Sequence, residues 1–201
     1  MPNHPDCPIS RSYQEAIDRF LNRLRGMDVT IKTAAPTFDF ARATEVMNLL
    51  VRAETAPKVP LIEDFKKRHG VVAPGRNDFS RLNAYGAGLS HLEWLALHEE
   101  RMRYSQIFEE FFEGFDLFLC PAAFTEAAPL RPGLNVTDRT VPVDGREEPV
   151  LKQHMLYMFA SLCYLPSHVL PIAELDTGLP VGVQLVGARG RDLSVLRIAQ
   201  Q

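Results

Sequence analysis

Serine hydroxyls are the first residues that could do chemistry, because a serine beside a base can attack a carbonyl carbon. The sequence contains no Gly-x-Ser-x-Gly elbow, and no two serines are adjacent. Ser12 and Ser90 each stand three residues before a glutamate, which is the pattern of a helix-capping box. We therefore predict that both serines begin helices, and we identify no catalytic serine.

Cysteine thiols are the second candidates. Cys7, Cys120 and Cys163 are widely scattered, which fits neither a disulfide framework nor a metal motif and favours reduced thiols in a cytoplasmic protein. Cys120 ends an apolar run and Cys163 lies inside another, so both are predicted to pack as small core residues. A Cys-dependent hydrolase that pairs either of these thiols with His154 or His168 remains an open alternative.

The sequence gives little support for a metal site or a cofactor site. The histidines and glutamates of residues 91–100 do not form a His-Glu-x-x-His repeat, and His91 and His98 lie two helical turns apart. We predict a solvated helix face there and no metal. Gly86–Gly88 does not continue as a dinucleotide fingerprint, and Gly187–Gly190 lacks the Lys-Ser or Lys-Thr of a phosphate loop, so no cofactor is expected.

The composition is that of an ordinary globular protein. Of the 201 residues, 46% are hydrophobic and 23% are charged, and the net charge is −3 without a block of like charges. This balance excludes a disordered chain and predicts no nucleic-acid or membrane partner. Residues 1–10 do not resemble a signal peptide, and no apolar run is as long as a membrane helix. We expect one cytoplasmic domain over residues 1–201.

Helices and strands must position any site, and apolar periodicity, caps and Gly/Pro breakers predict their order. We expect a helix from Ser12 to Gly26, a strand Asp28–Lys32, a helix from Asp39 to before Pro57, a short helix Leu61–His69, a helix from Ser90 to about Glu113, a strand Phe115–Cys120, an irregular segment Ala122–Pro149, a helix Val150–Leu162, strands Ser167–Leu170 and Val181–Val186 around a turn at Asp176–Gly178, and a last helix Asp192–Gln201. Strands interleaved with helices predict an α/β fold with a mixed β-sheet and flanking helices.

One segment points to a family. The decapeptide Gly178–Gly187 closely resembles the carboxy-terminal signature of the amidase signature family. Residues 165–172 and 115–121, with Ala128 and Pro129, are similar to the strands and the proline-rich loop of that family. Upstream segments follow the family's order, so the resemblance spans essentially the whole chain. It implies the carboxy-terminal half of an amidase-signature domain.

The resemblance also implies an activity, the hydrolysis of a linear carboxamide by a Ser–cis-Ser–Lys triad. Family members hold that triad in their amino-terminal half, and this sequence has no serine pair and no Gly/Ser-rich stretch. No catalytic residue can therefore be assigned, and we expect the chain to be inactive alone. A small-molecule amide would bind once an amino-terminal half completes the enzyme.

The resemblance assigns few binding residues. Arg81 falls where part of the family carries an arginine that binds the substrate carboxylate, and it is the single substrate-binding candidate. The loop Pro121–Pro129 is a weaker candidate for lining a substrate tunnel. Ser161 and Tyr164 stand where many members carry asparagine and glycine, so that turn departs from the family pattern.

Two other functions stay open beside the amidase part. The chain could be a non-catalytic binding or oligomerisation module, or one part of a split amidase. Half of a sheet exposes apolar faces and strand edges, which drive association with a second copy or with an amino-terminal partner chain. The Cys-dependent hydrolase is the third alternative.

Overall fold

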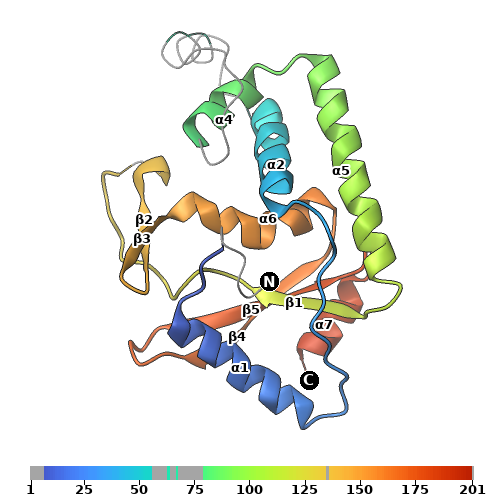
Figure 1. The fold of residues 1–201 in the computed structure, drawn as a ribbon, viewed down its shortest axis with the longest axis vertical. Helices are drawn as coiled ribbons and strands as arrows, with labels where there is room; N and C mark the ends of the chain where they lie inside the picture. Colours follow the sequence, from blue (N-terminus) through green and yellow to red (C-terminus); the bar gives the residue numbers. More distant parts are fainter. Residues whose placement is uncertain (1–6, 56–62, 64–66, 68–78, 135, 201) are drawn as a thin grey trace.

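A computed structural model describes residues 7–55, 63, 67, 79–134 and 136–200 (Figure 1). The described helices and strands are α1 (Arg11–Arg25), α2 (Phe40–Thr55), α4 (Phe79–Ala87), α5 (His91–Phe111), β1 (Leu117–Pro121), the 3₁₀ turn η1 (Val136–Asp138), β2 (Thr140–Val143), β3 (Arg146–Pro149), the 3₁₀ turn η2 (Val150–Gln153), α6 (His154–Leu162), β4 (Ser167–Glu174), β5 (Pro180–Gly187) and α7 (Asp192–Ala199). Of the predicted helix Leu61–His69, the described residues are Glu63 and Lys67, both helical, and the rest lies outside the described part.

The main sheet has the strand order β1–β5–β4, and both of its pairings are antiparallel. β5, the second half of the signature hairpin, is therefore the central strand. A second, two-stranded antiparallel sheet joins β2 to β3. The α/β fold is confirmed. Every strand pair within the described residues is antiparallel, so a parallel pair, which a mixed sheet also needs, is not found among them.

Helices cover both faces of the main sheet. In Figure 1, α2, α5 and α6 lie on one side, and α1 and α7 lie on the other. Side chains alternate between the faces, as the two-residue period of a strand requires. Phe118 and Val186 belong to the core beneath α2, α5 and α6. Val183 and Ile172 belong to a smaller core shared with Tyr13 of α1.

Helix α5 begins as the sequence predicts. The Ser90 hydroxyl accepts a hydrogen bond from the Glu93 amide at 3.2 Å, and the Glu93 carboxylate accepts one from the Ser90 amide at 2.7 Å. These reciprocal bonds satisfy two amides that the first helical turn leaves without partners. The Ser90 capping box is therefore confirmed.

Helix α1 begins differently from the prediction. Its N-cap is Ser10, which makes no side-chain capping bond, and Ser12 lies inside the helix. The Arg11 amide donates instead to the Asp144 carboxylate, with both N–O distances 3.1 Å. The predicted Ser12 capping box is wrong, because an acceptor from the distant β2–β3 turn takes over the first turn of the helix.

Two further segments differ from the sequence prediction. Asp28–Lys32 forms no strand, and it links α1 to α2 as an exposed connection. The segment Ala122–Pro149, predicted to be irregular, contains the β2–β3 hairpin. Asp144 and Gly145 form its tip with φ values of 47° and 80°, the left-handed pair that a two-residue hairpin turn requires.

Candidate functional site

The signature hairpin is shaped by its glycines. Gly178 has a φ of 77° in the β4–β5 turn, a conformation that only glycine adopts without strain. A Cβ atom on Gly182 would lie 2.7 Å from the Leu170 carbonyl oxygen, and one on Gly187 would collide with Val195 of α7. The glycines that carry the family resemblance therefore permit close contact between β5, β4 and the last helix.

Gln184 is the unusual residue of this hairpin. It lies in the centre of β5, directly across from Cys120 on one side and Val169 on the other. Its side chain is only 2% exposed, yet its Nε2 atom has no hydrogen-bond partner among the described residues. Neighbouring Val169 is 53% exposed. A buried amide donor beside an exposed apolar side chain marks a place where the described structure lacks an acceptor.

Sequence reasoning did not single out Gln184, although it lies within the quoted decapeptide. The available signal was a lone amide among the valines and leucines of a strand buried on both faces. Such a strand is ordinarily apolar throughout, so a polar residue in its middle indicates a specific partner.

The loop Pro121–Pro129 is fastened to two helical segments. The Ala122 amide donates to the Tyr13 hydroxyl at 3.0 Å, and the Phe124 amide donates to the Gln153 side chain at 2.9 Å. The Tyr13 hydroxyl in turn donates to the Gly182 carbonyl. These bonds hold the proline-rich loop against the same end of β5 that carries Gly182.

The structure leaves Arg81 untested. Its backbone lies in α4, but its side chain lies outside the described part, so its substrate-binding role stays a prediction. The same helix explains the nearby Gly86, because a Cβ there would lie 2.9 Å from the Leu49 carbonyl of α2. The rejected glycine motif therefore serves close packing of two helices.

The cysteine candidates are poor nucleophiles. Burial raises the pKa of Cys120 and of Cys163 to about 12, because a thiolate loses its hydration inside an apolar core. The Cys120 thiol donates to the Leu156 carbonyl at 3.8 Å. The reactive species of a cysteine enzyme is the thiolate, so these surroundings speak against a Cys-dependent hydrolase. They agree with the prediction of core positions.

The histidines on α5 take part in stacking. The Trp94 ring is nearly parallel to His98, with centroids 5.1 Å apart, and to His91, with centroids 6.4 Å apart. His98 also contacts Arg101, with 2.5 Å between Nδ1 and Nη2. The face is largely exposed, as predicted, and its two histidines stack on Trp94. Within the described residues, no group of three or more metal-binding side chains gathers.

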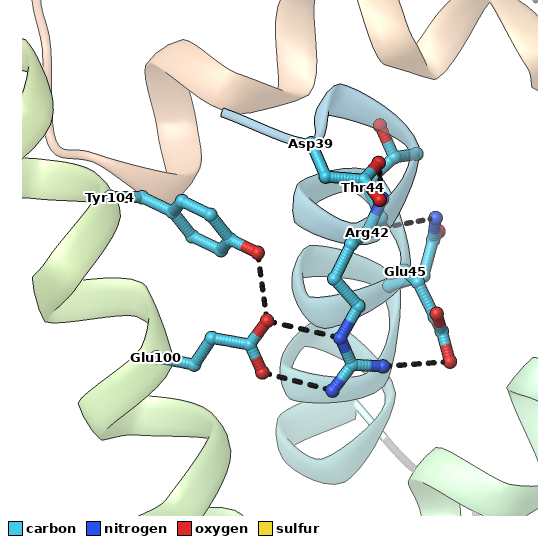
Figure 2. A network of polar contacts seen from close by, with 7 residues as sticks. Asp39, Arg42, Thr44, Glu45, Glu100 and Tyr104 are labelled. Carbon is cyan, nitrogen blue, oxygen red and sulfur yellow. Dashed lines mark hydrogen bonds and ion pairs between the residues drawn. The ribbon is translucent and has the colours of Figure 1, made fainter. Parts of the chain in front are cut away.

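A network of charged residues joins α2 to α5 (Figure 2). The Arg42 guanidinium donates to both oxygens of Glu100, at 3.0 and 2.9 Å, and it also pairs with Glu45 at 2.9 Å. The Tyr104 hydroxyl donates to Glu100 at 2.7 Å. Burial alone would raise the pKa of Glu100, but the hydrogen bonds from Arg42 and Tyr104 and the charge of Arg42 outweigh it, and that pKa is lowered.

This network predicts an acid-sensitive step in stability. A carboxylate whose pKa is lower in the folded state stabilises the fold above its unfolded pKa, and the contribution is lost as the pH falls through the folded value. We expect the urea midpoint of the wild-type chain to fall as the pH drops from 6 through the ordinary glutamate value of 4.5 and below it. Glu100→Gln should show a smaller fall over the same range. Equal slopes for the two proteins would contradict the assignment.

Similarity to known proteins extends over nearly the whole chain. The amidase family model matches residues 2–196. The chain belongs to the amidase family. The resemblance seen in the Gly178–Gly187 decapeptide is thereby confirmed.

The relatives of this amidase-family chain are larger proteins. It is 28% identical over 101 residues to a glutamyl-tRNA(Gln) amidotransferase subunit of Treponema pallidum, an alignment covering 50% of this chain and 18% of the relative. A crystal structure of an amidase matches 95% of the chain with a TM-score of 0.69 and 24% identity, and the match takes up 41% of that protein. A bacterial aryl acylamidase of the amidase signature family matches with a TM-score of 0.67 and 20% identity, over 96% of this chain and 39% of that one.

The fold is thus that of these enzymes, and this chain spans about two fifths of their length. No helix of the described residues has the length and hydropathy to cross a membrane. The comparisons show that the signature hairpin belongs to an amidase-family fold. They assign no role to an individual side chain.

Proposed function

We propose that this chain forms the carboxy-terminal part of a single-domain carboxamide hydrolase, and that it does not hydrolyse amides by itself. The observation that carries the proposal is the extent of the family match. Residues 2–196 match the family model, yet the chain covers only 41% of the amidase structure that it resembles. The remaining part of such an enzyme would have to supply the nucleophile.

The residues of this chain support that view. A carboxamide resists attack, so its hydrolysis needs an activated nucleophile and donors that stabilise the developing oxyanion. The chain contains no adjacent serine pair. Of its described lysines, Lys32 and Lys67 are exposed and Lys152 is paired with Glu148 at 2.9 Å. None of these three is placed in a buried site where a neutral lysine base would form.

The test is ammonia release from a panel of aliphatic and aromatic carboxamides. The pure 201-residue chain should release none above a heat-inactivated control. Adding the amino-terminal part of the enzyme, as a separate polypeptide or on one longer chain, should restore release. Turnover by the chain alone that survives repurification would overturn the proposal, and loss of that turnover on thiol alkylation would assign it to a cysteine.

We further propose that Gln184 contacts the amino-terminal part of the enzyme. Its buried amide has no acceptor among the described residues, and a backbone carbonyl of the complementary segment would provide one. An unsatisfied buried amide destabilises the isolated chain by about 1–3 kcal/mol. We expect Gln184→Met, which has a similar volume and no polar group, to raise the free energy of urea unfolding of the isolated chain by about 1–2 kcal/mol.

The control is Gln106→Met, because Gln106 is exposed on α5. That change should leave the unfolding free energy within about 0.5 kcal/mol of the wild type. If Gln184→Met destabilises the isolated chain, the amide already has a partner there, and the proposed contact is wrong. In the completed enzyme, the same substitution should weaken assembly.

A second candidate function is association without catalysis. β4 is an edge strand of the described sheet, and its Val169 side chain is 53% exposed. An exposed apolar side chain beside an unpaired strand edge favours binding to another chain, either a second copy or an amino-terminal partner. Light scattering distinguishes the outcomes, because a mass equal to one chain at all concentrations rejects self-association. We further propose a cytoplasmic location, which the three free cysteines support.

A further inference from the structure

Tyr164 holds its backbone in a conformation that tyrosine ordinarily avoids. Its φ is 57°, in the left-handed region, at the connection between α6 and β4. Asp144 also has a positive φ, but it belongs to an Asp-Gly hairpin turn that suits it. Tyr164 lies at the carboxy-terminal cap of α6, where the Leu165 amide donates to the Ala160 carbonyl at 2.9 Å and the Tyr164 amide donates to the Ser161 carbonyl at 3.3 Å. This pattern puts the residue after the cap in the left-handed region, and glycine is the usual residue there. The cap therefore explains the positive φ, but a tyrosine in place of glycine keeps backbone strain that the turn itself does not need, so the ring of Tyr164 requires an explanation.

Two guanidinium groups approach that ring from distant parts of the chain. The Cζ atom of Arg101, on α5, lies 4.8 Å from the Tyr164 ring centroid. The Cζ atom of Arg189, between β5 and α7, lies 5.4 Å from the same centroid. Both distances are within the range of a cation–π contact. Two positive charges from distant parts of the chain therefore contact the same aromatic ring.

The positive charge at this ring is not balanced. Within the described residues, no acidic side chain lies within ion-pair distance of Arg101 or Arg189. The Nε atom of Arg101 is buried and has no hydrogen-bond partner there. Arg101 is also held in place, because its Nη2 atom contacts His98 at 2.5 Å and His98 stacks on Trp94. The buried Nε is closed to solvent, so an anion would be bound by the outer N–H groups of this oriented guanidinium.

We propose that Arg101, Arg189 and Tyr164 form a binding site for an oxyanion group, either a phosphate or a carboxylate. Guanidinium groups present planar sets of N–H donors that match both kinds of oxyanion. The site is open to solvent, since Arg189 is exposed and Tyr164 is 46% exposed. Its ligand would lie between α5 and the loop that follows β5. The site does not depend on amide hydrolysis, so it can be tested on the isolated chain.

The test uses inorganic phosphate and acetate as probes, with chloride at matched ionic strength as the reference. Thermal unfolding of the complete 201-residue chain is followed at increasing concentrations of each probe, and titration calorimetry gives the affinity. A bound ligand raises the unfolding midpoint by mass action. We expect one of the two oxyanions to raise it beyond chloride. A response to phosphate or to acetate alone tells which chemistry the site takes.

Arg189→Gln is the main variant, because an exposed side chain can be replaced without loss of the fold. It should weaken binding by about ten-fold or more, which corresponds to the loss of a charge-assisted hydrogen bond. Arg146→Gln is the matched control, since Arg146 is likewise exposed but lies on β3. Its affinity should equal that of the wild type.

Tyr164→Gly separates binding from a merely structural role. Glycine adopts a φ of 57° without strain, so the unfolding midpoint should stay constant or rise. The oxyanion response should be lost, because the ring no longer holds the two arginines together. If neither oxyanion raises the wild-type midpoint beyond chloride, or if Arg189→Gln retains the full response, the proposed site does not exist.

Discussion

Replacing Phe108 by alanine is expected to lower the free energy of unfolding by about 3–5 kcal/mol, the range found for large aromatic side chains removed from a packed core. Phe108 of α5 is fully buried. Its ring stacks on Phe159 of α6 at a centroid distance of 5.3 Å and meets Phe38 edge-on at 5.4 Å. Phe159 in turn contacts Phe118 of β1 at 6.0 Å. Removing Phe108 would therefore open a cavity where two helices meet the main sheet.

Urea unfolding followed by far-ultraviolet circular dichroism measures this loss. Leu92→Ala is the matched control, because Leu92 lies on the same helix and is largely exposed. That variant should stay within about 0.5 kcal/mol of the wild type. A cost below about 1 kcal/mol for Phe108→Ala would mean that α5 does not pack on α6 as described. Relaxation of the surrounding side chains fills only part of a cavity of this size, so it cannot remove most of the cost.

Local signals in the sequence located most elements of this fold. The capping box at Ser90, the apolar run before Pro121 and the turn at Gly178 each predict an element that the structure contains. These signals succeed because the interactions behind them are made between neighbouring residues. The family resemblance then joined the elements into an amidase-type fold, which periodicity alone could not do.

The wrong predictions of secondary structure have one main physical origin, which is contact between residues far apart in the chain. Ser12 shows the capping pattern, but Asp144 accepts the hydrogen bond at the start of α1. The β-branched residues near Val29 favour a strand, but no neighbouring strand within the described residues pairs with them. A strand exists only through its partner, and a sequence does not display the partner. The Asp144–Gly145 turn, in contrast, was a local signal that the prediction of an irregular segment overlooked.

The candidate sites were harder to predict than the fold. Arg101 and Arg189 converge only because α5 and the end of β5 flank the same turn. Tyr164 was noticed as a departure from the family pattern, and its positive φ arises at the local cap of α6, but its two cationic neighbours belong to the tertiary structure. Gln184 is part of the decapeptide on which the family resemblance rests. Its importance depends on burial and on the absence of an acceptor among the described residues, neither of which the sequence reveals.

Substituting Gly182 by alanine should destabilise the chain by about 2–3 kcal/mol, since an added group in a packed interior forces the backbone to shift. The new Cβ would lie 2.7 Å from the Leu170 carbonyl oxygen and 3.2 Å from a Val169 methyl group. Leu170 belongs to β4 and pairs with Val183 of β5. Its carbonyl therefore cannot move away without opening the signature hairpin. The Tyr13 hydroxyl, which donates to the Gly182 carbonyl, would be displaced as well.

The sign of this effect is diagnostic. In the absence of a collision, alanine in place of a glycine in a strand stabilises a protein by about 0.5–1 kcal/mol, because the unfolded chain has less freedom to lose. Gly114→Ala serves as the control, since the nearest atom to its new Cβ is 3.9 Å away. Urea unfolding compares the two variants. A Gly182→Ala protein as stable as the wild type would show that β4 and β5 are not in the close contact described. A destabilised one would mean that the family resemblance at this glycine reflects the close approach of two strands.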